Sequence, residues 1–199
     1  MPKVTEEHRQ AMRARIQEAA LACFARKGFG GASMADIIKE AGLSAGAVYI
    51  YYPSKAALTI DVGRRVMEQR VGGLGEFPEG EEVPPPHVVF PNLLASIFDD
   101  HPFAPLILQV WGEASHAPGF ASLSSEIFGE LLGHFESYLN VYFVRARGLG
   151  AGEAAERARL LAPAVLSLMQ GSIVQASILG EESQARVSAS LEALLESMG

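Results

Sequence analysis

Apolar side chains recur at helical spacing along most of the chain, without a convincing alternating pattern of the kind that marks a β-strand. The first such stripe consists of Met12, Ile16, Ala20, Cys23 and Phe24. Residues three or four positions apart share one face of a helix, so this stripe predicts an amphipathic helix. Thr5 is placed to cap its start and Gly28 to end it. The pattern as a whole predicts an all-α fold.

Two short helices follow, joined by a glycine turn. Ser33 and Asp36 form a variant of the capping box that opens the first of them. Gly42 stands where a helix needs a left-handed residue at its end. Ser44 then caps a second helix that must stop near Tyr52, because a proline comes next. This spacing predicts a helix-turn-helix, whose second helix can lie in the major groove of DNA.

A stretch rich in glycine, proline and glutamate divides the chain. Residues 72–91 are predicted to be a loop or partly disordered connector. Before it lie a helix-turn-helix domain at 1–58 and a connecting helix at about 54–71; after it lies a helical body at 92–199. Within the body, helices are predicted near Asn92–Asp100, Phe103–His116, Phe120–Arg147, Glu153–Leu179 and Ser183–Met198.

The string from Ser33 to Leu58, SMADIIKEAGLSAGAVYIYYPSKAAL, closely resembles the DNA-binding domain of TetR-family transcriptional regulators. Further matches are the run FARKGF that starts at Phe24, and Leu108-Gln-Val-Trp-Gly-Glu113, which is similar to a segment of some subfamilies. The resemblance to the DNA-binding domain covers about Arg9 to Val71. It implies a homodimer that represses transcription from a palindromic operator in double-stranded DNA, and that is released when a small-molecule effector enters the body.

The distribution of charge agrees with a DNA-binding N-terminal part. The net charge of −7 argues against binding to phosphates, which requires basic residues. Up to Leu58, however, eight basic and five acidic residues give +3, while the remainder gives −10. The chain therefore joins a basic N-terminal domain to an acidic body.

The predicted DNA-contacting residues follow from the motif and from the resemblance. Lys55 is expected to meet a phosphate, as the matching lysine does in the family, and Ser33 and Ser44 offer hydroxyls and helix N-termini to phosphates. No Lys, Arg, Asn or Gln lies between Ser44 and Tyr52, so the usual bidentate readers of guanine and adenine are missing. Base reading would then depend on thymine methyl contacts, tyrosine hydroxyls and DNA shape. The remaining predicted contacts are Ala45, Gly46, Ala47, Tyr49, Ile50 and Tyr51, although each tyrosine has packing or a phosphate contact as an equal alternative.

The body is predicted to hold an apolar or aromatic effector between facing helices. The candidate ligand-binding residues are Phe103, Gln109, Trp111, Glu113, Phe128, His134, Phe135, Tyr138, Met169 and Gln170. Most of the aromatic stripe to which some of them belong is expected to be ordinary core.

The uncharged helix at Leu160–Gly180 is apolar on more than one face, and the last helix carries a single apolar stripe. Together they favour a dimer interface of four helices over simple closure of the core. The candidate interface residues are Leu161, Val165, Leu168, Ser172, Ala176, Leu191, Leu194 and Leu195.

Other function classes receive little support. The histidines are scattered and Cys23 is the only cysteine, so neither a metal site nor a catalytic site is expected, and no cofactor is predicted. The single cysteine favours the reducing cytoplasm. The uncharged segment Leu160–Gly180 is long enough to span a bilayer but carries too many polar groups, so we expect no membrane span. The alternative to the repressor hypothesis is a helical ligand-binding or protein-interaction module that has lost sequence-specific DNA reading.

Overall fold

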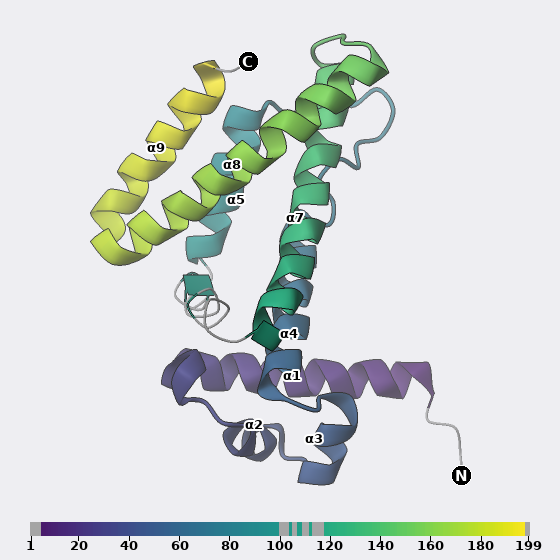
Figure 1. Ribbon diagram of the computed structural model, residues 1–199, viewed down its shortest axis with the longest axis vertical. Coiled ribbons are helices and arrows are strands. Elements are labelled where there is room, and N and C mark those ends of the chain that lie inside the picture. Colours follow the sequence, from purple (N-terminus) through teal and green to yellow (C-terminus); the bar gives the residue numbers. More distant parts are fainter. Residues whose placement is uncertain (1–4, 100–103, 105–106, 109–111, 113–117, 198–199) are drawn as a thin grey trace. The chain divides into compact units, whose positions relative to one another are not determined.

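A computed structural model of the protein describes residues 5–99, 104, 107–108, 112 and 118–197. In these residues α-helices are joined by turns and loops, as predicted. The chain, drawn in Figure 1, divides into two compact units. One unit comprises Met1–Val66 and Leu106–Ile127, and the other comprises Met67–Pro105 and Phe128–Gly199.

The first unit begins with α1 (Glu6–Gly31), whose end signals act as expected. Thr5 caps the helix by accepting a hydrogen bond from the backbone N–H of His8 at 3.3 Å. Gly28 interrupts the helical conformation with a φ of 71°, a left-handed value that glycine adopts without strain. The predicted stripe is buried from Ile16 to Phe24, which places one face of α1 in the core of this unit.

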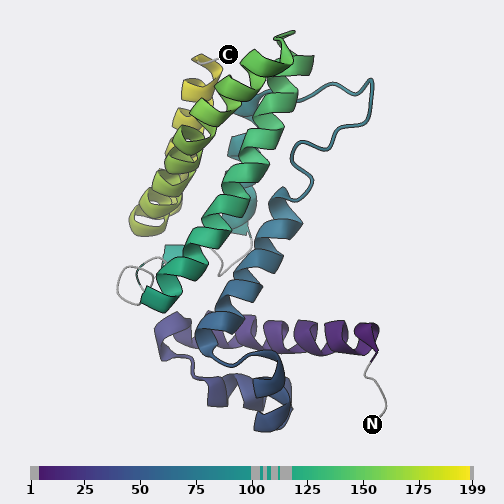
Figure 2. The same ribbon diagram turned by 45° about the vertical axis from the view of Figure 1, so that its right-hand side comes forward.

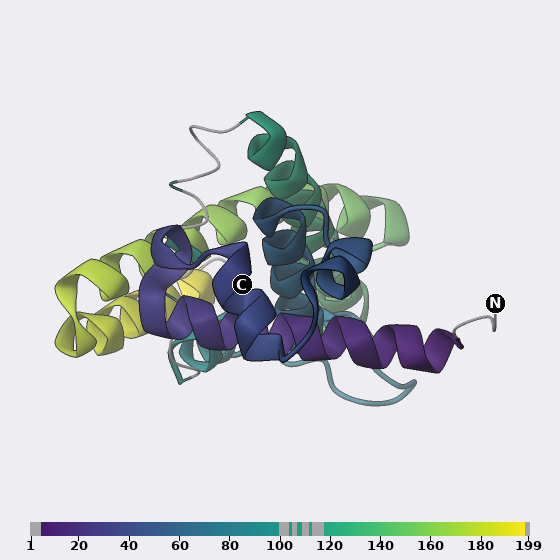
Figure 3. The same ribbon diagram turned by 90° about the horizontal axis from the view of Figure 1, so that it is seen from below.

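The helix-turn-helix is present as predicted. It consists of α2 (Met34–Ala41), which packs on α1, and α3 (Ala45–Tyr51), which packs on α2. Ser33 and Asp36 form a complete capping box at the start of α2, and Gly42 takes the left-handed conformation with φ 62°. Figure 3 shows α1, α2 and α3 of this unit from below.

Ser54 accepts a hydrogen bond from the N–H of Ala57 at 3.1 Å and so caps α4 (Lys55–Val71). This helix passes through the division between the two units, which falls after Val66.

The second unit contains α5 (Pro86–Asp99), most of α7 (Pro118–Arg145), α8 (Ala151–Leu179) and α9 (Glu181–Ser197). Helices α8 and α9 lie side by side, and α5 packs on both (Figures 1 and 2). Among the described residues, α8 is the helix long and apolar enough to cross a membrane by length and composition. The buried face of α8 packs within the second unit, and a core helix can have the same length and apolar composition as a membrane span.

Two details of the connector differ from the prediction. Helix α5 begins at Pro86 rather than near Asn92, because proline suits the first helical position, where a backbone N–H is not needed. The preceding segment is also held in place: the Arg145 guanidinium donates to the carbonyl oxygens of Phe77 at 2.9 Å and Pro78 at 2.8 Å. The Tyr138 hydroxyl donates to the carbonyl of Pro84 at 2.6 Å. This part of the connector is therefore an anchored loop.

Candidate nucleic-acid interface

The exposed face of α3 is the first part of the candidate interface. Ser44 caps the helix by accepting from the N–H of Ala47 at 3.2 Å, which fixes the start of α3. Val48 is 0% and Tyr52 2% exposed, and these two residues fasten the helix to the core of the first unit. On the other side Ile50 is 81% and Tyr49 48% exposed. An isoleucine so open to water on a short, capped helix is a candidate contact for an apolar group of a partner.

The other predicted contacts on α3 fall into two groups. Ala45 and Gly46 are exposed, and a Cβ added at Gly46 would meet nothing within 4 Å. Ala47 and Tyr51 are half-buried, so each offers only part of its surface to a partner. The sequence therefore predicted the direction of this face, and the structure shows that Ile50 dominates it.

The two serines have different hydrogen-bonding roles. The Ser33 hydroxyl accepts from the N–H of Asp36 and donates to the Asp36 carboxylate at 2.7 Å, so its proton is already used. The Ser44 hydroxyl accepts one hydrogen bond, and its proton remains for a phosphate oxygen. Of the two predicted phosphate contacts, Ser44 therefore has the better placed donor.

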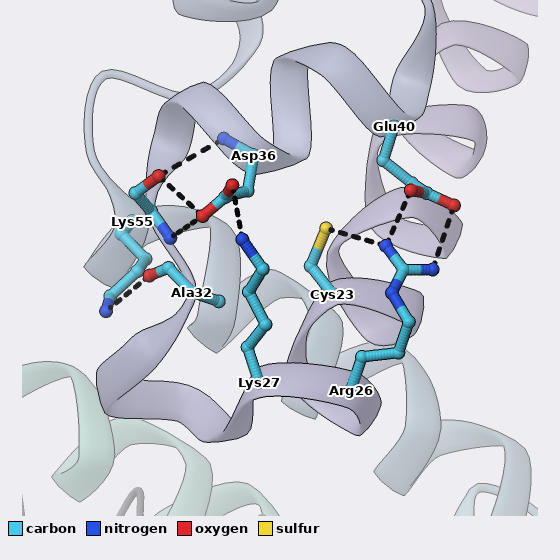
Figure 4. A network of polar contacts seen from close by, with 8 residues as sticks. Cys23, Arg26, Lys27, Ala32, Asp36, Glu40 and Lys55 are labelled. Carbon is cyan, nitrogen blue, oxygen red and sulfur yellow. Dashed lines mark hydrogen bonds and ion pairs between the residues drawn. The ribbon is translucent and has the colours of Figure 1, made fainter.

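Lys55 lies at the start of α4, and its ammonium group points into the first unit. It donates to the carbonyl oxygen of Ala32 at 3.0 Å (Figure 4). It also donates to the carbonyl oxygen of Phe29 at 2.8 Å and lies 4.3 Å from the centre of the Phe29 ring. These contacts satisfy carbonyl groups where α1 ends, which the sequence pattern did not indicate. An ammonium has three protons, so the phosphate contact stays a prediction beside this structural role.

Two ion pairs connect α1 to α2 and use two of the basic residues of the N-terminal domain (Figure 4). Lys27 lies 2.6 Å from Asp36, and Arg26 lies 2.6 Å from Glu40. Lys39, by contrast, is exposed and has no charged partner among the described residues. Lys39 is thus a candidate phosphate contact that the sequence analysis did not single out, because sequence does not show which cations are already paired.

The hydrogen bonds of Lys55 to the carbonyls of Phe29 and Ala32 are expected to stabilise the first unit. We expect Lys55→Met to lower the free energy of unfolding by about 1–3 kcal/mol, because two carbonyls lose a charged donor while the aliphatic chain is kept. The matched variant Lys39→Met should change it by less than about 0.5 kcal/mol, since that side chain is exposed. Urea denaturation of both variants measures the difference. Equal stabilities of the two variants would show that Lys55 does not hold the end of α1.

The carboxylates of these ion pairs make the stability of the first unit depend on pH. Hydrogen bonds from Lys27 and Ser33 hold the pKa of Asp36 well below its ordinary value, and the hydrogen bond and charge of Arg26 lower the pKa of Glu40. Groups with lowered pKa stabilise the fold above their unfolded pKa of about 4 and stop doing so as the pH falls through their folded pKa. We therefore expect stability to decrease below about pH 4.5, and Asp36→Asn to flatten that decrease. Urea unfolding at a series of pH values tests this, and an unchanged slope in the variant would contradict it.

The predicted effector residues in the second unit are mostly interior. Phe135 is 1%, Tyr138 0% and Met169 3% exposed, which makes them core side chains in this structure. Phe128 and Gln170 are half-buried, as is His134, whose Nε2 lies 3.5 Å from the Glu68 carboxylate. Phe103, Gln109, Trp111 and Glu113 lie outside the described residues.

Much of the predicted dimer stripe is covered within the single chain. Five of its eight residues are buried inside the single chain, because α8, α9 and α5 pack on one another. They are Val165, Ser172, Ala176, Leu191 and Leu195. Leu161 and Leu168 are half-buried and Leu194 is 44% exposed. The largest exposed apolar side chains on α8 are instead Leu160, Ile178 and Leu179. The sequence pattern showed apolar faces but not which of them the chain itself would cover.

Comparisons with known proteins agree with the helix-turn-helix. Residues 16–69 match the family model described as bacterial regulatory proteins, tetR family. An uncharacterized HTH-type transcriptional regulator of Bacillus subtilis, YfiR, is 45% identical over 67 residues, covering 34% of this chain and 31% of the relative. The HTH-type transcriptional repressor Rv1474c of Mycobacterium tuberculosis is 35% identical over 69 residues, covering 35% of this chain and 37% of the relative. The chain thus matches about a third of the length of these relatives.

Solved structures resemble the whole chain in fold. Salmonella enterica GusR matches with a TM-score of 0.70 at 24% identity, over 97% of this chain and 96% of that one. The transcriptional regulator FadR of Bacillus subtilis, solved with stearoyl-CoA, matches with a TM-score of 0.65 at 18% identity, over 92% and 96% of the two chains. At these identities the likeness concerns the fold, in which a helix-turn-helix unit and a helical body belong to one chain.

Proposed function

We propose that this chain, a TetR-family regulator by its N-terminal domain, acts in the cytoplasm as a ligand-responsive transcriptional repressor. It would bind a palindromic operator as a homodimer, with α3 of each copy in the major groove. The observation that carries the proposal is the capped helix-turn-helix, whose exposed α3 face is held in place by buried Val48 and Tyr52. The B-DNA major groove is about 12 Å wide and admits one α-helix.

The chemistry of α3 supports a particular kind of base reading. Its exposed face offers Gly46, Tyr49 and Ile50, without a side chain that could bond guanine or adenine in the bidentate manner. Thymine is distinguished in the major groove by its C5-methyl group, which an apolar side chain can contact. We therefore propose that thymines lie opposite Ile50 in each half of the operator.

The remaining parts of the proposal concern the effector and the second copy. A fold similar to that of a regulator solved with stearoyl-CoA supports an apolar effector in the body. Phe128, His134 and Gln170 are the described candidates that keep exposed surface for it. The exposed apolar residues Leu160 and Ile178 on α8 support a helical dimer interface that differs from the stripe predicted from sequence.

Selection of DNA by the purified protein tests the proposal directly. Duplexes retained from a pool of genomic fragments should share an inverted repeat, with half-sites spaced by about one helical turn of 34 Å. Replacing the thymines of each half-site by deoxyuridine removes only methyl groups and should weaken binding about fourfold per contacted methyl, which corresponds to about 0.8 kcal/mol.

Two results would contradict the proposal. If no duplex is retained at low salt, the chain is better explained as a ligand-binding or interaction module without DNA reading. If the uracil-substituted operator binds as well as the original, base reading does not depend on thymine methyl groups.

A further inference from the structure

A single carboxylate oxygen joins three helices of the first unit. Oδ2 of Asp61, on α4, accepts hydrogen bonds from Arg13 at 2.9 Å, Gln17 at 2.8 Å and the Tyr52 hydroxyl at 2.5 Å. Arg13 and Gln17 are one turn apart on α1, and Tyr52 is the C-cap residue directly after α3. This oxygen therefore links the end of α3 to both α1 and α4.

The surroundings of this carboxylate make the arrangement rigid. The Asp61 side chain is only 20% exposed, and the guanidinium of Arg13 also lies 5.5 Å from the centre of the Tyr52 ring. Gln17 uses its amide oxygen to accept from Arg65 at 2.9 Å, which adds a second connection between α1 and α4. Each donor is thus already oriented before any partner binds.

The ionisation states agree with this geometry. Burial, the largest influence on Asp61, opposes its ionisation, but the hydrogen bonds of Tyr52 and Arg13 outweigh it and lower the pKa. Burial and the hydrogen bond to Asp61 raise the pKa of Tyr52 to about 12. At neutral pH the contact is therefore a phenol donating to a carboxylate, a charge-assisted hydrogen bond of the stronger class.

We infer that Asp61 is a positioning residue that couples α4 to the recognition helix α3 through the hydroxyl of Tyr52. The inference rests on the proposed function, in which α3 reads DNA. Helix α4 continues from Asp61 to Val71, beyond the boundary of the first unit. A shift of α4 of about 1 Å at Asp61 would either lengthen these hydrogen bonds beyond normal donor–acceptor distances or move Tyr52 and the end of α3 together with Asp61.

Two conservative variants separate this role from general stabilisation. Tyr52→Phe removes only the hydroxyl, and Asp61→Asn removes the charge while keeping the size of the side chain. Glu40→Gln is the matched control, because it removes a carboxylate ion pair of the same unit that does not touch α3. Binding of the duplex selected by the wild-type protein, and of an unrelated duplex, is measured for each at one salt concentration.

We expect both variants to lose about tenfold in affinity for the selected duplex, with the unrelated duplex bound as before. The preference for the selected duplex then falls, because phosphate contacts remain while α3 is no longer held in its reading position. The double variant should be little worse than either single one, since both changes break the same contact. Glu40→Gln should keep the wild-type preference. Equal losses for both duplexes, or the same loss in Glu40→Gln, would overturn the inference.

A second measurement does not depend on DNA. In Tyr52→Phe and Asp61→Asn, the rate of amide hydrogen exchange should increase over the wild-type rate more in α3 than in α2. A purely structural role would instead increase the rate evenly across the unit. If the wild-type protein binds no duplex, the proposed function fails. The exchange pattern still decides whether Asp61 couples α4 to α3.

Discussion

Gly46→Glu is expected to stabilise the fold and to abolish operator binding. Gly46 is exposed in the first turn of α3, and an added Cβ would meet nothing within 4 Å. Replacing a helical glycine stabilises a helix by about 0.5–1 kcal/mol, and an acidic residue suits the helix N-terminus. In the proposed complex the same carboxylate would stand between α3 and the DNA. We expect the affinity for the selected duplex to fall at least about 100-fold, since close like charges at an interface cost several kcal/mol.

The chain offers a closely matched control for this variant. Gly30, in the last residues of α1, is also exposed and has open space around it. Gly30→Glu therefore introduces the same charge into the same unit, and we expect it to lower duplex affinity only a few-fold through net charge. Fluorescence anisotropy with the selected duplex, together with urea denaturation, measures both effects. Retention of wild-type affinity by Gly46→Glu would exclude the first turn of α3 from the interface.

Local signals in the sequence were sufficient to predict the helix-turn-helix. Capping by Ser33 and Ser44, and the left-handed turn at Gly42, depend on residues within a few positions of one another. The outward direction of Ile50 followed from the inward direction of Val48 and Tyr52, because a helix has a fixed period. These features depend on neighbouring residues in the sequence, so each segment by itself was sufficient to predict them.

Features that depend on distant partners could not be predicted in this way. The hydrogen bond between Tyr52 and Asp61 joins the end of α3 to α4. The hydrogen bonds from Lys55 to the carbonyls of Phe29 and Ala32 join residues more than twenty positions apart in the sequence. A polar residue on an amphipathic helix gives no sign of which donor it will meet after folding. The dimer stripe stays a prediction for the same reason, because an apolar face of α8 can be covered by α9 of the same chain or by a second copy.

Phe90→Ala is expected to cause the largest loss of stability in the second unit. Phe90 is 0% exposed, and its ring centre lies 4.8 Å from that of Phe135 and 5.4 Å from that of Tyr138. Truncating a fully buried phenylalanine removes its transfer free energy and leaves a cavity, at a cost of about 3–5 kcal/mol. Urea denaturation measures this loss in the free energy of unfolding. The control Phe77→Ala truncates a half-buried ring whose centre lies 6.3 Å from that of Tyr138, and it should lower the free energy of unfolding by about half as much or less.

The size of this loss also decides how the body can hold an effector. Phe135 and Tyr138 were predicted to line a ligand site, yet in the structure they pack against Phe90. A loss near 4 kcal/mol for Phe90→Ala would mean that these rings form a close-packed core, so an effector must bind elsewhere or separate them. A loss below about 1 kcal/mol would mean that the rings are loosely packed and that an effector can enter beside them. In that case a thermal-shift screen with acyl and aromatic compounds should find ligands that stabilise the wild type and not Tyr138→Ala.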